Sequence, residues 1–141
     1  ISKRFSLSGI EIPRYGGACP RWNVYTAFTT PGVLHTAVSK MNNGEKYVCI
    51  ARTVEKGIGR FGQSKNVLSI GLGCEAKYAK DFIYTENMNI NDKSTEIPIG
   101  VSCRTCDRLD CSQRAFPPLH KKFDVDLNSR GVSVYVSDDK S

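Results

Sequence analysis

Three cysteines of this chain, Cys103, Cys106 and Cys111, form a C-x2-C-x4-C pattern. This crowding constrains the fold, because three thiols so close in sequence cannot each reach a well-separated disulfide partner. A metal centre, in contrast, needs such local convergence. Cys19 in GGACPRW is the best candidate for a fourth ligand, because the glycines before it allow close backbone approach and Pro20 fixes the chain direction. The pattern predicts a four-cysteine metal-binding loop.

The spacing also bears on the metal. Zinc sites of four cysteines usually contain two C-x2-C pairs, and this chain has one. Iron–sulfur clusters more often take several cysteines from one loop and one distant cysteine, so the pattern favours a [4Fe–4S] cluster, with zinc as the alternative. Arg104, Arg108 and Arg114 would offset the negative charge of the thiolates. Thiols of a reduced loop without metal are a third interpretation, and Cys49 and Cys74 are interpreted as buried small apolar residues.

The length of 141 residues fits one domain. The chain starts without methionine and ends on a charged tail, so we expect a fragment with one domain at 1–136 and a disordered tail at 137–141. Its longest apolar runs are far shorter than the ~20 residues that cross a bilayer. We therefore expect a cytoplasmic location and no membrane contact.

The distribution of apolar residues and turn residues predicts an α+β fold with a mainly antiparallel sheet flanked by short helices. The segment 34–41 fits either a strand or a helical turn, and 86–95 reads as a loop. The predicted strands are 5–12, 46–54, 66–71 and 132–136, the predicted helices are 21–28 and 74–84, and 97–101 leads into the cysteine loop.

Charge and motifs limit the function classes. The net charge of +6 favours anionic partners, but the twenty basic residues are spread along the chain and do not form a nucleic-acid-binding arm. The chain has no HExxH or GxSxG motif, and GIGRFG lacks the spacing of a nucleotide-binding loop. His35 and His120 are interpreted as surface or capping residues. We therefore do not expect an enzyme.

Two motifs carry a resemblance to a known family. GGACPRWNVYTAF and CRTCDRLDCSQRAFPPL resemble the C-terminal sensory domain of the short-chain fatty acyl transcriptional regulators, bacterial proteins with an Xre-type helix-turn-helix that control glyoxylate-cycle and methylcitrate-cycle genes. The resemblance implies a GAF-like fold, a four-cysteine metal centre, and binding of coenzyme A or its short acyl thioesters. It also implies DNA binding through a helix-turn-helix outside this chain, and a homodimer in the full-length protein.

Coenzyme A carries phosphates, a flat adenine and a thin apolar arm, so its site needs cations, an aromatic platform and a narrow apolar slot. Arg21 and Arg114 each lie beside a cysteine motif, and we expect them to converge on phosphate if the four thiols share a metal. The full set of candidate ligand contacts is Arg21, Trp22, Tyr25, Arg60, Phe61, Lys77, Tyr78 and Arg114.

Two other functions stay open at this point. A zinc-stapled nucleic-acid-binding module would place Arg104 and Arg108 on phosphates and bind DNA with strong salt dependence. A thiol-redox protein would need one cysteine with a depressed pKa.

Overall fold

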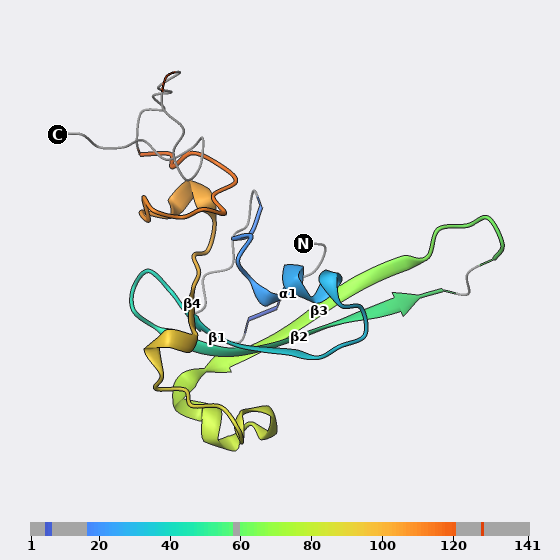
Figure 1. Ribbon diagram of the computed structural model, residues 1–141, viewed down its shortest axis with the longest axis horizontal. Coiled ribbons are helices and arrows are strands. Elements are labelled where there is room, and N and C mark those ends of the chain that lie inside the picture. Colours follow the sequence, from blue (N-terminus) through green and yellow to red (C-terminus); the bar gives the residue numbers. More distant parts are fainter. Residues whose placement is uncertain (1–4, 7–16, 58–59, 121–127, 129–141) are drawn as a thin grey trace. The chain divides into compact units, whose positions relative to one another are not determined.

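The computed structural model describes residues 5–6, 17–57, 60–120 and 128 (Figure 1). The chain divides into two compact units. The first, which we call the sheet unit, comprises 21–40 and 44–98. The second, which we call the cysteine unit, comprises 1–20, 41–43 and 99–141.

The sheet unit is built on a mixed sheet with the strand order β3-β2-β1-β4. β1 pairs antiparallel with β2 and β2 pairs antiparallel with β3, whereas the short β4 runs parallel to β1. The predicted α+β class with a mainly antiparallel sheet is therefore confirmed. The strands are β1 (His35–Lys40), β2 (Lys46–Lys56), β3 (Asn66–Glu75) and β4 (Glu96–Pro98).

The core of this unit lies where β1 and β2 overlap. Val38 and Val48 are cross-strand partners and are fully buried, and Ala37 and Ala51 are buried beside them. Gly44 has a φ of +88° in the turn between the two strands, a conformation that L side chains rarely adopt. The hairpin therefore combines β-branched residues on a buried face with a glycine at its turn.

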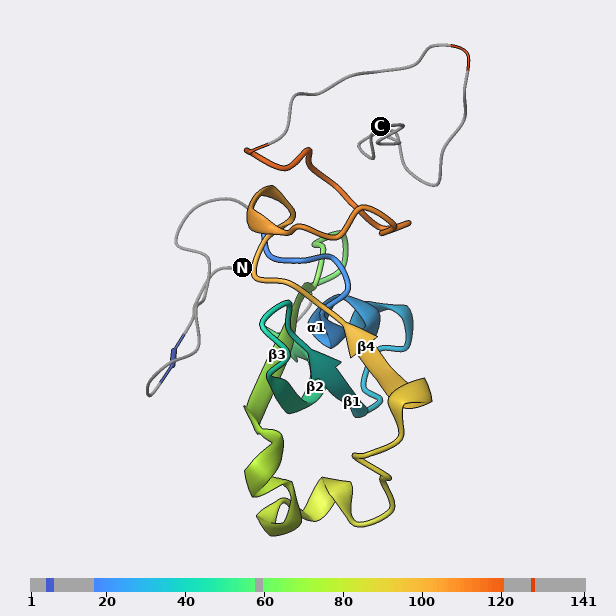
Figure 2. The same cartoon turned by 90° about the vertical axis from the view of Figure 1, so that its left-hand side faces the viewer.

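A short helix packs on one face of the sheet. α1 (Asn23–Thr26) continues into η1 (Ala27–Thr29), and α1 lies against β2 and β3 (Figure 2). A Cβ atom at Gly71 would overlap the Val24 side chain, so glycine is required for this close approach. The helix predicted at 21–28 is confirmed in type, although its α-helical part is only one turn long.

The helix predicted at 74–84 is confirmed only in part. β3 continues through Cys74, which pairs with Val48, and the chain then forms the 3-10 helices η2 (Ala76–Asp81) and η3 (Ile83–Thr85). The hydrogen-bonded ladder with β2 thus takes the first two residues of the segment CEAKYAKDFIY, and most of the remaining residues are helical with the tighter 3-10 hydrogen bonds. The Thr85 hydroxyl donates to the carbonyls of Ala79 and, at 2.6 Å, Phe82, which holds the two 3-10 helices together.

The other strands and loops predicted between residues 34 and 95 are confirmed, with changed bounds. The strands predicted at 46–54 and 66–71 are confirmed and are longer than predicted, and 34–41 contains the strand β1. The loop at 86–95 ends in η4 (Lys93–Thr95), capped by Asp92. The predicted strand 132–136 and tail 137–141, and all but the start of the strand 5–12, lie outside the described residues. No helix among the described residues is long and apolar enough to cross a membrane.

Candidate metal centre

The cysteine loop begins with one turn of 3-10 helix, η5 (Cys103–Thr105). The Ser102 hydroxyl caps this turn by accepting a hydrogen bond from the Arg104 backbone N–H at 3.3 Å. At the other end of the loop, the Leu119 N–H donates to the Arg104 carbonyl at 2.8 Å. The loop therefore closes on itself through backbone hydrogen bonds.

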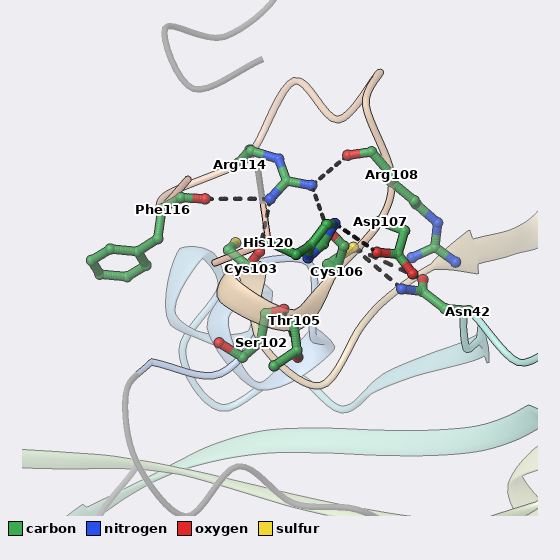
Figure 3. A network of polar contacts seen from close by, with 10 residues as sticks. All are labelled: Asn42, Ser102, Cys103, Thr105, Cys106, Asp107, Arg108, Arg114, Phe116 and His120. Carbon is green, nitrogen blue, oxygen red and sulfur yellow. Dashed lines mark hydrogen bonds and ion pairs between the residues drawn. The ribbon is translucent and has the colours of Figure 1, made fainter. Parts of the chain in front are cut away.

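A buried arginine occupies the middle of this loop. The Arg114 side chain is 6% exposed, and its guanidinium donates to the carbonyls of Cys103 at 2.7 Å, Cys106 at 2.9 Å and Phe116 at 3.3 Å, and to the carbonyl of Arg108 (Figure 3). Two of these acceptors belong to predicted metal ligands. Arg114 thus fixes the backbone of the C-x2-C segment directly.

Two cysteine sulfurs in the loop accept hydrogen bonds. Cys103 Sγ accepts from the Ala115 N–H at 3.4 Å. Cys106 Sγ accepts from Asn42 Nδ2 at 3.5 Å (Figure 3). Donors directed at sulfur stabilise the thiolate form, and such hydrogen bonds tune metal-bound thiolates. The surroundings of both sulfurs therefore suit a metal ligand.

The turn that contains Cys19 is tied to the segment before the loop. The Cys19 N–H donates to the Val101 carbonyl at 3.3 Å, and a Cβ at Gly17 would lie 3.5 Å from the Phe116 ring. Cys19 itself is buried. The turn with Cys19 and the segment before the loop are therefore held side by side by a backbone hydrogen bond.

The four predicted ligands have the right chemistry for a metal centre. Cys19, Cys103 and Cys106 are buried, Cys111 is half-buried, and all four belong to the cysteine unit in the thiol form. Among the described residues, however, no three His, Cys, Asp or Glu side chains lie close enough together to hold a metal ion. Four thiols are a donor set that fits either an iron–sulfur cluster or zinc. To bind either one, the four sulfurs would have to move closer together. The metal centre therefore stays a prediction.

The two remaining cysteines lie in the sheet unit. Cys49 and Cys74 are half-buried in β2 and β3, which is less than the full burial expected. Burial raises the pKa of the Cys49 thiol, and burial followed by the charge of Glu75 raises the pKa of Cys74. Because a redox-active or nucleophilic cysteine needs a depressed pKa, neither residue suits a thiol-redox function.

Both histidines take part in local polar contacts. His35 Nε2 lies 2.6 Å from the Thr30 hydroxyl, and His120 Nε2 lies 3.0 Å from an Asp107 oxygen. His120 is exposed and His35 is half-buried at the start of β1. These positions agree with the surface or capping role predicted for them.

Seven of the eight predicted coenzyme A contacts lie in the sheet unit. Arg21 and Trp22 are half-buried before α1, and Tyr25 is exposed on α1. Arg60 and Phe61 are exposed in the β2–β3 connection. Lys77 and Tyr78 form a second pair in η2.

Lys77 Nζ lies 4.9 Å from the centre of the Tyr78 ring and 2.5 Å from a Glu75 oxygen. The pKa of Lys77 is raised, mainly by its hydrogen bond to Glu75. The ammonium group is therefore charged at neutral pH and shared with a carboxylate. An anionic ligand would have to compete with Glu75 for it.

The predicted role of Arg114 as a phosphate contact is not favoured by its position. Both of its terminal nitrogens already donate to loop carbonyls, and the side chain is buried. Arg21, its expected partner, belongs to the sheet unit. The structure instead gives Arg114 the role of positioning the cysteine loop.

Asn42 is a site residue that the sequence analysis missed. It lies in the NNGE segment, which indicated only a turn. Its amide donates to Cys106 Sγ, and the Cys106 thiol lies 3.9 Å from Asn42 Oδ1. No sequence pattern marks it, because its partner Cys106 lies 64 residues further along the chain.

The chain is similar to a family of regulators and to individual regulators of known bacteria. The family model described as "Short-chain fatty acyl coenzyme A regulator, C-terminal" matches residues 1–135. The chain is 41% identical over 138 residues to the HTH-type transcriptional regulator RamB of Mycobacterium tuberculosis (strain CDC 1551 / Oshkosh), covering 96% of this chain and 29% of that protein. It is 42% identical over 135 residues to the propionyl-CoA carboxylase regulator of Cereibacter sphaeroides, with the same coverage of both chains.

A solved structure has the same fold. The chain matches a Mycobacterium tuberculosis transcriptional regulator with a TM-score of 0.84 and 34% sequence identity, covering 96% of this chain and 41% of that one. The chain thus spans less than a third of the length of the curated relatives it matches.

Proposed function

Because the chain belongs to the family of short-chain fatty acyl coenzyme A regulators, of which it matches the C-terminal part, we propose that it is the effector-sensing domain of a bacterial regulator of short-chain fatty acid metabolism. Its ligand would be coenzyme A or a short acyl-coenzyme A. The family match over nearly the whole chain carries this proposal. In the full-length protein, DNA would be bound by a helix-turn-helix outside this chain, and the protein would act in the cytoplasm.

The resemblance drawn from the two cysteine motifs is confirmed by the family match. The family and the relatives are transcriptional regulators, so the chain is not an enzyme. The antiparallel core of the sheet and its short helices are compatible with the GAF-like fold that the resemblance implies. That finer assignment is part of the proposal.

The sheet unit offers the chemistry that coenzyme A needs. Arg21 and Trp22 precede α1, and Tyr25 on that helix is 38% exposed, so a cation and two rings are close in sequence and accessible. Arg60 and Phe61 add a second cation and a fully exposed ring. Guanidinium groups bind phosphate in a bidentate way, and an aromatic face can stack on adenine.

The cysteine unit would hold a metal centre, a [4Fe–4S] cluster in preference to zinc. Cys19, Cys103, Cys106 and Cys111 would be the ligands, and a bound cluster would supply a redox-sensitive link between the first turn and the loop. The N–H donors on Cys103 and Cys106 and the buried guanidinium of Arg114 support this assignment, because each favours negative charge on the ligands.

The response to ligand would be a population shift. A ligand that binds one conformation of the domain more tightly than another changes their ratio by its differential affinity. Residues 60–65 of the connection between β2 and β3, which include Arg60 and Phe61, form the segment whose conformation we expect ligand binding to change.

Calorimetric titration with propionyl-, acetyl- and free coenzyme A tests the ligand proposal. We expect saturable binding that Arg21→Ala weakens about tenfold, which is the loss of one charged contact. Arg52→Ala removes an exposed arginine of β2 that is not in the predicted site and serves as the matched control. Absence of binding to every coenzyme A species would contradict the proposal.

Anaerobic purification with metal analysis tests the metal centre. We expect iron and acid-labile sulfide, and their loss in Cys106→Ser but not in Cys74→Ser, the matched control in the sheet unit. Zinc alone would identify the alternative centre. A protein without metal, or equal loss in the two variants, would contradict a four-cysteine site.

A further inference from the structure

One face of the strand β3 carries exposed apolar side chains. Leu68, Ile70 and Leu72 of β3 are 37%, 51% and 62% exposed. Side chains alternate along a strand, so these three share the face opposite to the one on which Gly71 contacts Val24 of α1. α1 thus covers one face, and this second face of β3 is accessible.

β3 also presents an unprotected backbone edge. Among the described strands it is paired only with β2, and β1 pairs with β2 only up to Ala51, so the far half of β2 and β3 forms a two-stranded ribbon (Figure 1). The segment 67–74 contains no charged residue and no proline. Natural edge strands usually carry such residues to prevent pairing with another chain.

We propose that β3 pairs antiparallel with β3 of a second copy of this chain, about a two-fold axis at Ile70, so that the sheet continues across the dimer. In this register Ile70 lies opposite its own copy and Leu68 lies opposite Leu72 of the second copy. The three apolar side chains of each chain then form one continuous apolar row on the accessible face.

The charges at the ends of the strand select this register. Lys65 and Glu75 flank the apolar segment and come opposite each other when Ile70 is on the axis, because both lie five residues from it. A shift of the axis to Gly71 would place Lys65 opposite Lys77, and a shift to Ser69 would place it opposite the uncharged Gly73. Opposite charges across a strand pair stabilise it, and like charges destabilise it.

The other face of the strand is compatible with this pairing. Ser69 would lie opposite Gly71 of the second copy, and Val67 opposite Gly73, so each pair on this face contains a glycine. Each chain already pairs Lys65 with Glu55 at 2.8 Å and Glu75 with Lys77 at 2.5 Å. In the dimer, Lys65 of one copy would also face Glu75 of the other, so the two ion pairs would join into one row of charges of alternating sign.

Sedimentation equilibrium of the chain under reducing conditions tests the proposal. We expect a reversible dimer that Ile70→Lys weakens at least tenfold, because two lysines then meet on the axis. Ile83→Lys is the matched control, since Ile83 is an exposed isoleucine of the same unit outside β3, and it should leave the dimer unchanged. A wild-type chain that stays monomeric up to about 1 mM, or equal effects of the two variants, would overturn the proposal.

Charge exchange distinguishes this register from a general effect on folding. Lys65→Glu places a second carboxylate opposite Glu75, and Glu75→Lys places a second ammonium group opposite Lys65, so each variant alone should dimerise several-fold more weakly than the wild type. In a heterodimer of the two variants, each end of the strand pair joins a carboxylate of one chain to an ammonium group of the other, so an equimolar mixture should associate more tightly than either variant alone. The double variant Lys65→Glu with Glu75→Lys restores opposite charges at both ends and should recover the wild-type affinity. A double variant that associates no better than the single variants would refute the register.

Discussion

The sheet unit and the cysteine unit are stabilised in different ways. In the sheet unit, paired strands satisfy the backbone, and Val38 and Val48 bury apolar surface at their centre. In the described part of the cysteine unit, much of the loop backbone is satisfied by one side chain, the buried Arg114. A strand ladder distributes its stabilisation over many residues, whereas the loop concentrates it on a single residue.

This difference predicts unequal sensitivity to single substitutions. A sheet loses part of its packing when one core side chain is shortened, because its backbone hydrogen bonds remain. The loop loses several hydrogen bonds at once when Arg114 is removed, and buried carbonyls are left unpaired. Substitutions at Arg114, Val48, Gly71 and Glu96 test this difference between the two units.

Arg114→Ala should have the largest effect. It leaves buried carbonyls of the loop without a donor, so the free energy of opening the loop should fall by about 3 kcal/mol or more. Hydrogen exchange with mass spectrometry should show lost protection over 100–119 and unchanged protection in β2. Arg104→Ala is the control: Arg104 lies over the Phe116 ring at 4.9 Å, and its loss should cost under about 1 kcal/mol. Equal loss of protection in β2 would contradict the contrast between the units.

Val48→Ala should lower the free energy of unfolding of the sheet unit by about 2 kcal/mol, because Val48 is fully buried. Urea denaturation followed by circular dichroism measures this change. Val33→Ala, at a valine that is 53% exposed, should change it by less than about 0.5 kcal/mol. If Val48→Ala destabilised as strongly as Arg114→Ala, the stabilisation of the sheet would not be distributed.

Gly71→Ala should destabilise the sheet unit by about 1 kcal/mol, because the new methyl group would overlap the Val24 side chain. Adding Val24→Ala should remove the overlap, so the double variant should be less destabilised than the sum of the two single variants predicts. Thermal denaturation of the four proteins measures this coupling. Strict additivity would mean that α1 does not pack on Gly71.

The smallest effect concerns the attachment of β4. The Glu96 carboxylate pairs with Lys46 and, at 3.2 Å, with Lys40, and its hydrogen bond to Lys46 is the main cause that lowers its pKa below 4.5. A lowered pKa in the folded state stabilises the fold above about pH 4.5, and this contribution is lost as the pH falls through the folded value. Wild type should therefore lose more stability than Glu96→Gln between pH 7 and pH 3 in urea titrations. Parallel pH profiles would show that the ion pairs contribute nothing.

The same contrast explains what the sequence could predict. The alternation of apolar residues in 46–54 and 66–71 predicts the strands correctly, because burial on one face leaves a period of two. The prediction for 74–84 holds only in part, because Cys74 and Glu75 pair with β2 residues far away in sequence and most of the remainder forms 3-10 helix in place of α-helix. The structural roles of Arg114 and Asn42 could not be predicted from sequence. Arg114 donates to backbone carbonyls and Asn42 to a sulfur, and the positions of these acceptors depend on the folded loop.

The four-cysteine pattern shows both what spacing in the sequence can predict and what it cannot. Spacing alone identified the cysteine loop as the candidate chemical site, and the structure places all four cysteines in one unit with Cys19 hydrogen-bonded to the segment before the loop. Spacing could not reveal that the loop is organised around a buried guanidinium. It also could not say how far the sulfurs must move to reach a common metal.

Arg114 contacts main-chain oxygens in the loop, and every residue type supplies the same oxygen. The side chains of exposed neighbours such as Leu109 and Asp110 are therefore not needed to shape the loop. In a saturation mutagenesis library, these positions should accept most substitutions apart from proline, while position 114 accepts almost none. The outward surface of the loop can therefore diversify among homologues while the backbone of the loop stays the same.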